Sequence, residues 1–201
     1  MASNRSRSET RKEKRRQEIL RISSRIFREK TYDGTTLKDI ADAVGMLKGS
    51  LYYYISSKQE LFSDIIVEAV KVLNESVEDV YRANLPPVER LRAIIRAHVK
   101  FSVEYQDTAI LFLTGRHIIS SMRMVELTRL FGRRDKLLIN TLKEAVDSGV
   151  YRKIDVRMAA LAIVGMCNSV AFWYSPSGPA SADDIAEVFF SIVHYGLAVR
   201  N

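Results

Sequence analysis

The apolar residues of this chain recur at intervals of three and four, which is the spacing of an amphipathic helix. Near the N-terminus Ile19, Ile22, Ile26 and Phe27 fall on one face of such a helix, and arginines surround the rest of it. No segment shows the strict alternation of apolar and polar residues that marks a half-buried strand. The pattern therefore predicts an all-α fold.

Capping and turn residues divide the pattern into about nine helices. Thr36 with Asp39 indicates a capping box that opens a short helix, and Gly45 ends that helix. Ser57 with Glu60 indicates a second capping box, which opens a long helix. After the first helix, we expect helices near 36–43, 47–55, 58–82, 87–105, 108–120, 123–148, 156–174 and 182–198.

The two short helices indicate the domain organisation. A short helix, a glycine turn and another short helix form the helix-turn-helix unit. We therefore expect residues 1–56 to form a basic arm and a helix-turn-helix DNA-binding domain. Residues 57–201 are expected to form a larger C-terminal helical domain.

The net charge of +7 is concentrated at one end of the chain. Residues 1–28 contain ten Lys or Arg and three Glu, while the remaining 21 basic and 21 acidic residues cancel. A basic end suits an anionic partner such as nucleic acid, because neutralising phosphates releases condensed counterions. For residues 1–8 taken alone, a solvated tail is an equal alternative.

Composition narrows the class of protein further. The N-terminus is polar, and we expect no apolar segment long enough for a membrane helix, so the protein is predicted to be cytosolic with no membrane partner. Cys167 is expected to be a small buried hydrophobe. With no glycine-rich phosphate loop and no metal-ligand spacing, we expect no enzyme, cofactor or metal. An enzyme using His98 or His117 is the alternative.

The stretch KGSLYYYISSKQELF (48–62) carries the candidate DNA contacts. Leu51 and Ile55 would pack inward. The outward and flanking residues are then Lys48, Gly49, Ser50, Tyr52, Tyr53 and Tyr54. In a major groove, small residues permit close approach, and hydroxyls and aromatic faces meet phosphates, base edges or thymine methyls. Lys58 would clamp a phosphate beside a helix N-terminus. For Tyr54 above all, half-buried packing is the alternative.

The stretch TTLKDIADAVGMLKGSLYYYISSKQELF (35–62) resembles the signature of the TetR family of bacterial and archaeal transcriptional repressors. That pattern implies phosphate or base contacts at Thr36, Lys48, Tyr52, Tyr53, Tyr54 and Lys58. The chain departs from it at Leu47, where many relatives have a capping serine or threonine. It departs again at Tyr54, where histidine is common, and at Ile55, where phenylalanine is common.

The resemblance also implies that the C-terminal domain binds an effector and dimerises. In the family, the last two helices pair with their copies in a four-helix bundle. The apolar faces of 156–174 and 182–198 favour this interpretation, and a simple core is the alternative. The candidate dimerisation residues are Met158, Leu161, Gly165, Ile185, Phe189 and Ile192. A two-fold homodimer would read an inverted repeat in double-stranded operator DNA.

Two apolar segments with sparse polar residues, TAILFLTGRHIISSM and AALAIVGMCNSVAFWYSPSGP, fit either a small-molecule site or a helical core. The ending FWYSPSGPASADDIAEVFFSIVHYGL, with GMLKGSLYYY, resembles the TetR subgroup that represses fatty-acid or steroid degradation and responds to acyl-CoA. This implies a repressor released by a medium- or long-chain acyl-CoA. The candidate contacts are Phe101, Tyr105, Leu111, Phe112, Arg116, Arg123, Phe131, Asn168 and Trp173, with the two arginines facing the CoA phosphates. The alternatives are a drug-like or aromatic ligand, as for a regulator of efflux, and an activator with no small ligand.

Overall fold

The computed structural model describes the backbone of residues 2–199 and the side chains of residues 11–199. This part of the chain is helical throughout apart from turns and one isolated bridge between Tyr151 and Ala198, so the all-α prediction with about nine helices is confirmed. The helices are α1 (Ala2–Lys30), α2 (Leu37–Val44), α3 (Lys48–Leu51), α4 (Lys58–Arg82), α5 (Pro87–Glu104), α6 (Gln106–Gly115), the 3₁₀ turn η1 (Arg116–Ile118), α7 (Ser121–Asp147), α8 (Val156–Trp173) and α9 (Ala182–Leu197).

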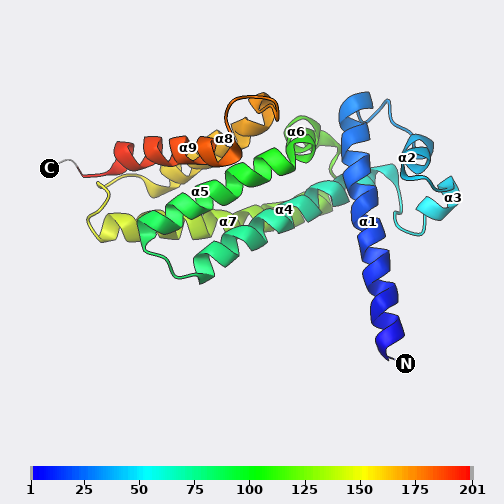
Figure 1. Cartoon of the computed structure of the whole chain (residues 1–201), viewed down its shortest axis with the longest axis horizontal. Coiled ribbons are helices and arrows are strands. Elements are labelled where there is room, and N and C mark those ends of the chain that lie inside the picture. The colour runs from blue at the N-terminus through cyan, green and yellow to red at the C-terminus, as the bar shows by residue number, and fades with distance from the viewer. Residues whose placement is uncertain (1, 200–201) are drawn as a thin grey trace.

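The helices form two parts that meet at α1 (Figure 1). A bundle of α4 to α9 lies on one side of α1, which crosses the end of this bundle, and α2 and α3 lie on the other side. Helix α4 runs from the bundle to α1. The C-terminal end of the chain lies at the end of the bundle that is remote from α2 and α3.

Local capping explains where α2 and α4 begin. The Thr36 hydroxyl accepts a hydrogen bond from the Asp39 amide (3.1 Å), and the Asp39 carboxylate accepts one from the Thr36 amide (2.8 Å), which completes the expected box. At α4 only half of the box forms. The Ser57 hydroxyl accepts from the Glu60 amide at 3.0 Å, but the Glu60 carboxylate turns to Arg123 at 3.2 Å.

Helix α3 is shorter than the expected helix over 47–55. Leu47 stands at its N-cap and makes no side-chain hydrogen bond there, because leucine carries no side-chain oxygen. After Leu51 the chain continues in tight turns, with bonds from the Tyr53 amide to the Ser50 carbonyl (3.2 Å) and from the Tyr54 amide to the Leu51 carbonyl (2.9 Å). The expected helix over 108–120 likewise ends early, at Gly115, and passes into the η1 turn.

Two hydrophobic cores divide the chain inside α4. The first core joins α1, α2 and α3 to the N-terminal half of α4, up to Val70, and it also takes in Leu111 of α6, Ile119, and Leu127 of α7. The second core lies within the bundle and takes up α4 from Leu73 onward. The expected boundary between residues 56 and 57 falls just before α4, whereas the packing places the division within that continuous helix.

The expectation that no segment is long and apolar enough to span a membrane is wrong for one helix, α8. Val156–Trp173 is long and apolar enough to do so, with 28% of that window buried in the structure. In the fold, α8 packs against α5, α6 and α7 with one side and leaves an apolar face exposed. This exposed apolar face is sufficient to explain why α8 is so rich in apolar residues.

The turn between α2 and α3 gives a stability prediction. Gly45 adopts φ +72°, a left-handed conformation that costs a residue with a Cβ about 1 kcal/mol. Gly45→Ala should therefore lower the free energy of unfolding by about that amount in urea denaturation. Gly132→Ala is the control, because Gly132 lies inside α7 with open space around its Cβ position, and alanine there should stabilise the protein by roughly 0.5–1 kcal/mol. Equal denaturation midpoints for the two variants would contradict the left-handed turn.

Candidate DNA-binding surface and effector cavity

The helix-turn-helix presents a polar and aromatic surface to solvent. Leu51 and Ile55 are buried against α1 and α2, as the sequence pattern predicts. Lys48, Gly49 and Ser50 are exposed, and so are the rings of Tyr52 and Tyr53, the latter with 66% of its surface accessible. Tyr54 is half-buried and packs on the first core. The recognition segment therefore offers two exposed tyrosines and one exposed lysine to a DNA partner.

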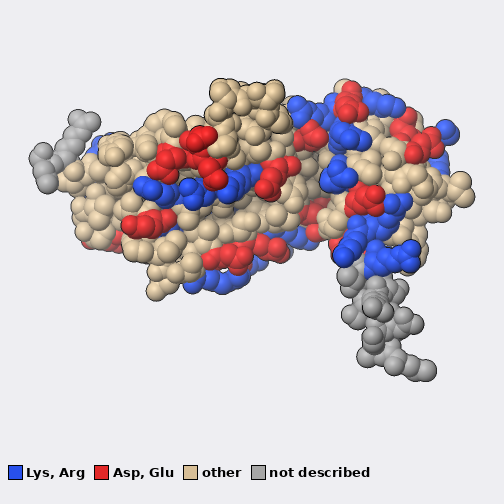
Figure 2. Space-filling model, in the orientation of Figure 1, with Lys and Arg blue, Asp and Glu red and all other residues tan. Residues whose placement is uncertain are grey.

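A basic groove runs beside these tyrosines. It is lined by Arg11, Lys12, Lys14, Arg15 and Glu18 of α1 and by Tyr53 and Tyr54. The Lys12 ammonium lies 4.3 Å from the centre of the Tyr53 ring. Figure 2 shows the blue Lys and Arg side chains gathered on α1 just above the grey N-terminal residues. The sequence locates the positive charge on α1, but nothing in the spacing of residues 12 and 53 predicts that they meet.

Lys58, a predicted phosphate contact, also makes contacts within the protein. Its ammonium donates hydrogen bonds to the Tyr32 carbonyl (2.9 Å) and to the Thr35 carbonyl (3.0 Å), and it lies over the Tyr32 ring. Two of its three protons are therefore used to hold the turn before α2 against α4. Thr36 is exposed, with its hydroxyl in the N-cap of α2. Lys48 is thus the better candidate for a phosphate contact.

A cavity of about 340 Å³ lies between α4, α5, α6, α7 and α8, and exposed residues such as Leu161 form part of its wall. Its walls are mainly apolar, and Leu73, Ala109 and Val164 belong to them. Five of the nine effector candidates line it, namely Phe101, Phe112, Arg116, Phe131 and Asn168. The rings of Phe112 and Phe131 are 5.2 Å apart, and the Arg116 guanidinium lies 5.4 Å from the Phe112 ring centre at the edge of the cavity.

A buried cation that the sequence analysis missed also lines the cavity. Arg134 is only 7% exposed, and its Nε and Nη2 both donate to one oxygen of Asp135 (3.0 and 2.7 Å). Its guanidinium lies 5.4 Å from the Phe131 ring centre. An arginine inside a helix usually lies in solvent, so its position in the sequence carried no signal of burial. A buried charge with one carboxylate partner is a natural anchor for a polar atom of a ligand.

The titratable groups behind the cavity stay uncharged at neutral pH. Burial, with a smaller contribution from the charge of Arg134, lowers the pKa of His98 to about 3, and the ring Nε2 lies 3.0 Å from the Asn168 amide oxygen. Burial also raises the pKa of the Cys167 thiol to about 12. His98 is therefore a fixed hydrogen-bonding partner of Asn168, and a role as a general base at neutral pH does not suit it.

Four effector candidates lie outside the cavity. Leu111 is buried in the first core, because its side of α6 faces α4 and α1. Tyr105 stacks on Phe101 with ring centres 4.9 Å apart and faces a different cleft. Trp173 is 52% exposed at the end of α8. Arg123 is held by the carboxylates of Glu60, Asp64 and Glu126, so it joins α7 to α4 and is not free for a phosphate.

The candidate dimerisation residues divide into an exposed set and a buried one. Met158, Leu161 and Ile192 are each about 60% exposed, and Gly165 is also exposed. Phe189 is half-buried, and Ile185 is only 5% exposed because it packs into the second core. Ile185 is therefore removed from the candidate surface. The structure adds further exposed apolar residues on the same two helices, namely Phe172, Val188 and Tyr195.

Ion pairs fix α1 on the bundle. Asp64 of α4 accepts from Arg16 of α1 (2.8 Å) and also binds Arg123 of α7. Arg28, near the end of α1, pairs with Asp107 of α6. Helix α1 is thus tied to two of the helices that enclose the cavity.

A helix-turn-helix packed against a helical bundle that holds an apolar cavity is the architecture of a DNA-binding transcriptional regulator. Residues 19–65 match the description "Bacterial regulatory proteins, tetR family", and residues 84–197 match "Tetracyclin repressor-like, C-terminal domain". The chain therefore belongs to the TetR family of transcriptional regulators. This family consists of DNA-binding regulators.

Individual relatives extend over nearly the whole chain. The HTH-type transcriptional repressor KstR2 of Rhodococcus jostii (strain RHA1) is 29% identical over 186 residues, which cover 92% of this chain and 91% of KstR2. The structure of PfmR from Thermus thermophilus is similar with a TM-score of 0.83 and 30% identity, over 90% of this chain and 99% of PfmR. The structure of AibR in complex with isovaleryl coenzyme A and operator DNA shares the fold with a TM-score of 0.79 and 24% identity, over 89% of this chain and 97% of AibR.

The placement of Lys48 gives a prediction on DNA binding. Lys48→Ala should weaken binding to operator and to random DNA by similar factors and reduce the salt dependence by roughly one phosphate contact, because a lysine on phosphate carries no sequence information. Fluorescence anisotropy over a salt series measures both. Lys143→Ala, at an exposed lysine of α7, is the control and should bind as the unmodified protein does. An unchanged salt slope for Lys48→Ala would remove Lys48 from the phosphate contacts.

Proposed function

We propose that this chain is a homodimeric transcriptional repressor that a CoA thioester releases from an inverted-repeat operator. The observation that carries the proposal is the apolar cavity beside α4, since α4 also forms part of the core of the DNA-binding domain. A ligand enclosed there touches the helix on which the recognition domain rests.

The size and lining of the cavity suit the acyl part of a thioester. A volume of about 340 Å³ has room for on the order of ten non-hydrogen atoms. Aromatic and aliphatic walls favour an apolar group, and Arg134 and Asn168 offer hydrogen bonds to a carbonyl or another oxygen. A short or medium acyl group fits this description better than the long chain that the sequence also allowed. The nucleotide of the CoA must then lie outside this cavity.

Similar proteins support the regulatory part of the proposal. KstR2, at 29% identity, is a transcriptional repressor, and AibR shows that this fold can hold both a CoA thioester and operator DNA. Another similar protein, FasR of Mycolicibacterium smegmatis, is an HTH-type transcriptional activator and is 24% identical over 183 residues. Activation is therefore the alternative mode of action. A regulator of either kind acts where the DNA is, so we propose a cytoplasmic location.

Release requires that the effector bind the DNA-bound and the released shapes with different affinities. The ion pairs of Asp64 with Arg16 and Arg123 join the three helices α1, α4 and α7, two of which line the cavity. A ligand that separates α4 from α7 would change the position of Asp64 and with it the position of α1. The coupling is reciprocal, so operator DNA should weaken effector binding by the same factor.

The exposed apolar face of α8 and α9 supports the dimer. An apolar patch of this kind on a soluble protein marks an interaction site. Two copies paired about a two-fold axis through this face would carry two recognition helices, as an operator with two half-sites about 34–36 Å apart requires.

The dimer gives a direct prediction. Ile192→Glu places a charge on a residue that is 58% exposed in the single chain, so the subunit should fold while the interface loses an apolar contact and gains an unpaired charge. Light scattering should show a folded monomer, and operator affinity should fall at least tenfold. Met122→Glu, at an exposed methionine of α7, is the control and should remain dimeric. A dimer of unchanged stability for Ile192→Glu would place the interface elsewhere.

The effector gives the second prediction. In an anisotropy titration, CoA thioesters with acyl chains from butanoyl to decanoyl should dissociate the operator complex, whereas free CoA should not. Val164→Phe should fill part of the cavity and abolish this response while operator binding persists. Val125→Phe, at an exposed valine of α7, is the matched control and should respond normally.

Two results would argue against this function in different ways. If no thioester in the series bound, while an uncharged aromatic or a drug-like cation did, the effector class would be wrong and the repressor would stand. If Val164→Phe responded like the unmodified protein, the effector site would lie outside this cavity.

A further inference from the structure

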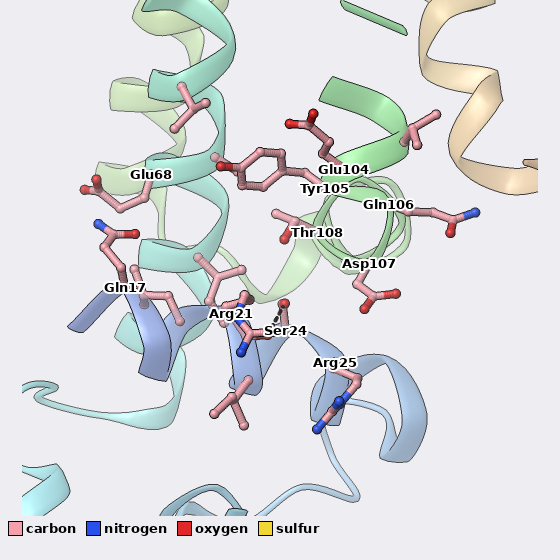
Figure 3. Close-up of a pocket in the computed structure, with 16 residues that line it drawn as sticks. Gln17, Arg21, Ser24, Arg25, Glu68, Glu104, Tyr105, Gln106, Asp107 and Thr108 are labelled. Carbon is pink, nitrogen blue, oxygen red and sulfur yellow. Dashed lines mark hydrogen bonds between the residues drawn. The ribbon is translucent and has the colours of Figure 1, made fainter. Parts of the chain in front are cut away.

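A second cavity lies at the junction between α1 and the bundle. It measures about 540 Å³ and opens between α1, α4 and the corner where α5 passes into α6. Figure 3 shows Gln17, Arg21, Ser24 and Arg25 of α1 on one side of this junction cleft. Across from them lie Glu68 of α4 and, from α5 and α6, Glu104, Tyr105, Gln106, Asp107 and Thr108.

The junction cleft and the effector cavity share a wall. Ala69 of α4 and Thr108 of α6 line both of them, and both residues are buried. These two small side chains therefore stand between the two spaces. A narrow flexible chain, such as the pantetheine arm of a CoA thioester, is the kind of group that could pass between them.

The α1 side of the junction cleft carries free positive charge. Arg21 makes no ion pair with any side chain of residues 11–199. Arg25 reaches only Glu29, at 3.8 Å and with both side chains more than 60% exposed, which is a weak pair. Guanidinium groups suit phosphates because their donors match the phosphate oxygens in pairs.

The carboxylates of the junction cleft do not cancel this charge. Glu68 is paired with Lys71 at 2.9 Å, and Asp107 is paired with Arg28. Glu104 lies on the side of the cleft away from α1 (Figure 3). The acids that line the cleft are therefore either paired, as Glu68 and Asp107 are, or on the side away from α1, as Glu104 is.

The other opening of the effector cavity, at Arg116, is a poorer site for a nucleotide. The Arg116 guanidinium already rests on the Phe112 ring, and the other arginine of this cavity, Arg134, is buried and paired with Asp135. The junction cleft offers two arginines and more volume than the effector cavity itself.

From this geometry we infer that the acyl group of the effector occupies the inner cavity while its pantetheine arm passes between Ala69 and Thr108 and its phosphates bind Arg21 and Arg25 in the junction cleft. This inference rests on the proposed function. It makes α1, a helix of the DNA-binding domain, part of the effector site. Asp107, which lines the cleft, pairs with Arg28 of α1, so phosphates next to it would act on the contact between α1 and α6.

The test separates the nucleotide from the acyl group. Calorimetry without DNA compares hexanoyl-CoA with hexanoyl-pantetheine, which lacks the nucleotide. Arg21→Ala should weaken binding of hexanoyl-CoA roughly tenfold, by loss of a charge-assisted contact, and should leave binding of hexanoyl-pantetheine unchanged. Arg21 is exposed, so the variant should fold normally. Arg82→Ala, at an exposed arginine near the far end of α4, is the control and should bind both probes as the unmodified protein does.

The outcomes distinguish the two proposals. If Arg116→Ala weakened hexanoyl-CoA selectively while Arg21→Ala and Arg25→Ala did not, the nucleotide would leave by the other opening, and this inference would be overturned with the acyl-CoA repressor intact. If Arg21→Ala weakened both probes equally, the residue would shape the whole site without contacting phosphate, which also overturns it. Failure of hexanoyl-CoA and of the longer and shorter thioesters to bind the unmodified protein would overturn the proposed effector itself.

Discussion

The burial of α4 in two separate hydrophobic cores joins the DNA-binding and effector parts of this chain. Phe62 and Ile66 anchor its first half in the core that contains α1, α2 and α3 together with residues of α6 and α7, and Leu73 and Val77 anchor its second half in the bundle. Because a helix of 25 residues transmits displacement as a nearly rigid rod, movement of one half must be matched by the other half or by a change at α1. A ligand that bound inside the bundle and displaced α4 would therefore also displace the DNA-binding domain.

Asp64 of α4 joins this helix to both α1 and α7. Its side chain is 14% exposed and is shared between Arg16 and Arg123, so removal of either partner would leave a poorly solvated charge less well compensated. Such a shared ion pair holds one geometry closely and loses much of its energy when the geometry changes. The contact between α1 and α4 is therefore suited to two discrete arrangements, as a switch between DNA-bound and released shapes requires.

Local patterns in the sequence predicted the parts of the structure that local forces determine. Thr36, Asp39 and Gly45 fix the ends of α2 through neighbours within a few residues, and they were predicted correctly. The roles of Lys58 and Arg123 could not be predicted in this way, because their partners Tyr32 and Asp64 are 26 and 59 residues away. The burial of Arg134 could not be predicted from the sequence either, because the packing of α7 against the bundle decides which arginine of α7 faces the cavity.

The same helix that bounds the effector cavity also carries the proposed dimer face. Leu161 lines the cavity and is 62% exposed on α8, so on dimerisation a partner subunit would cover one wall of the site. An effector that shifted α8 would then change the angle between the two subunits as well as the angle between α1 and α4 within each. Both changes alter the separation of the two recognition helices, and operator affinity depends steeply on that separation because half-site spacing is fixed by the DNA helix. Under the proposed function, small displacements at the cavity would be sufficient for release without unfolding of the DNA-binding domain.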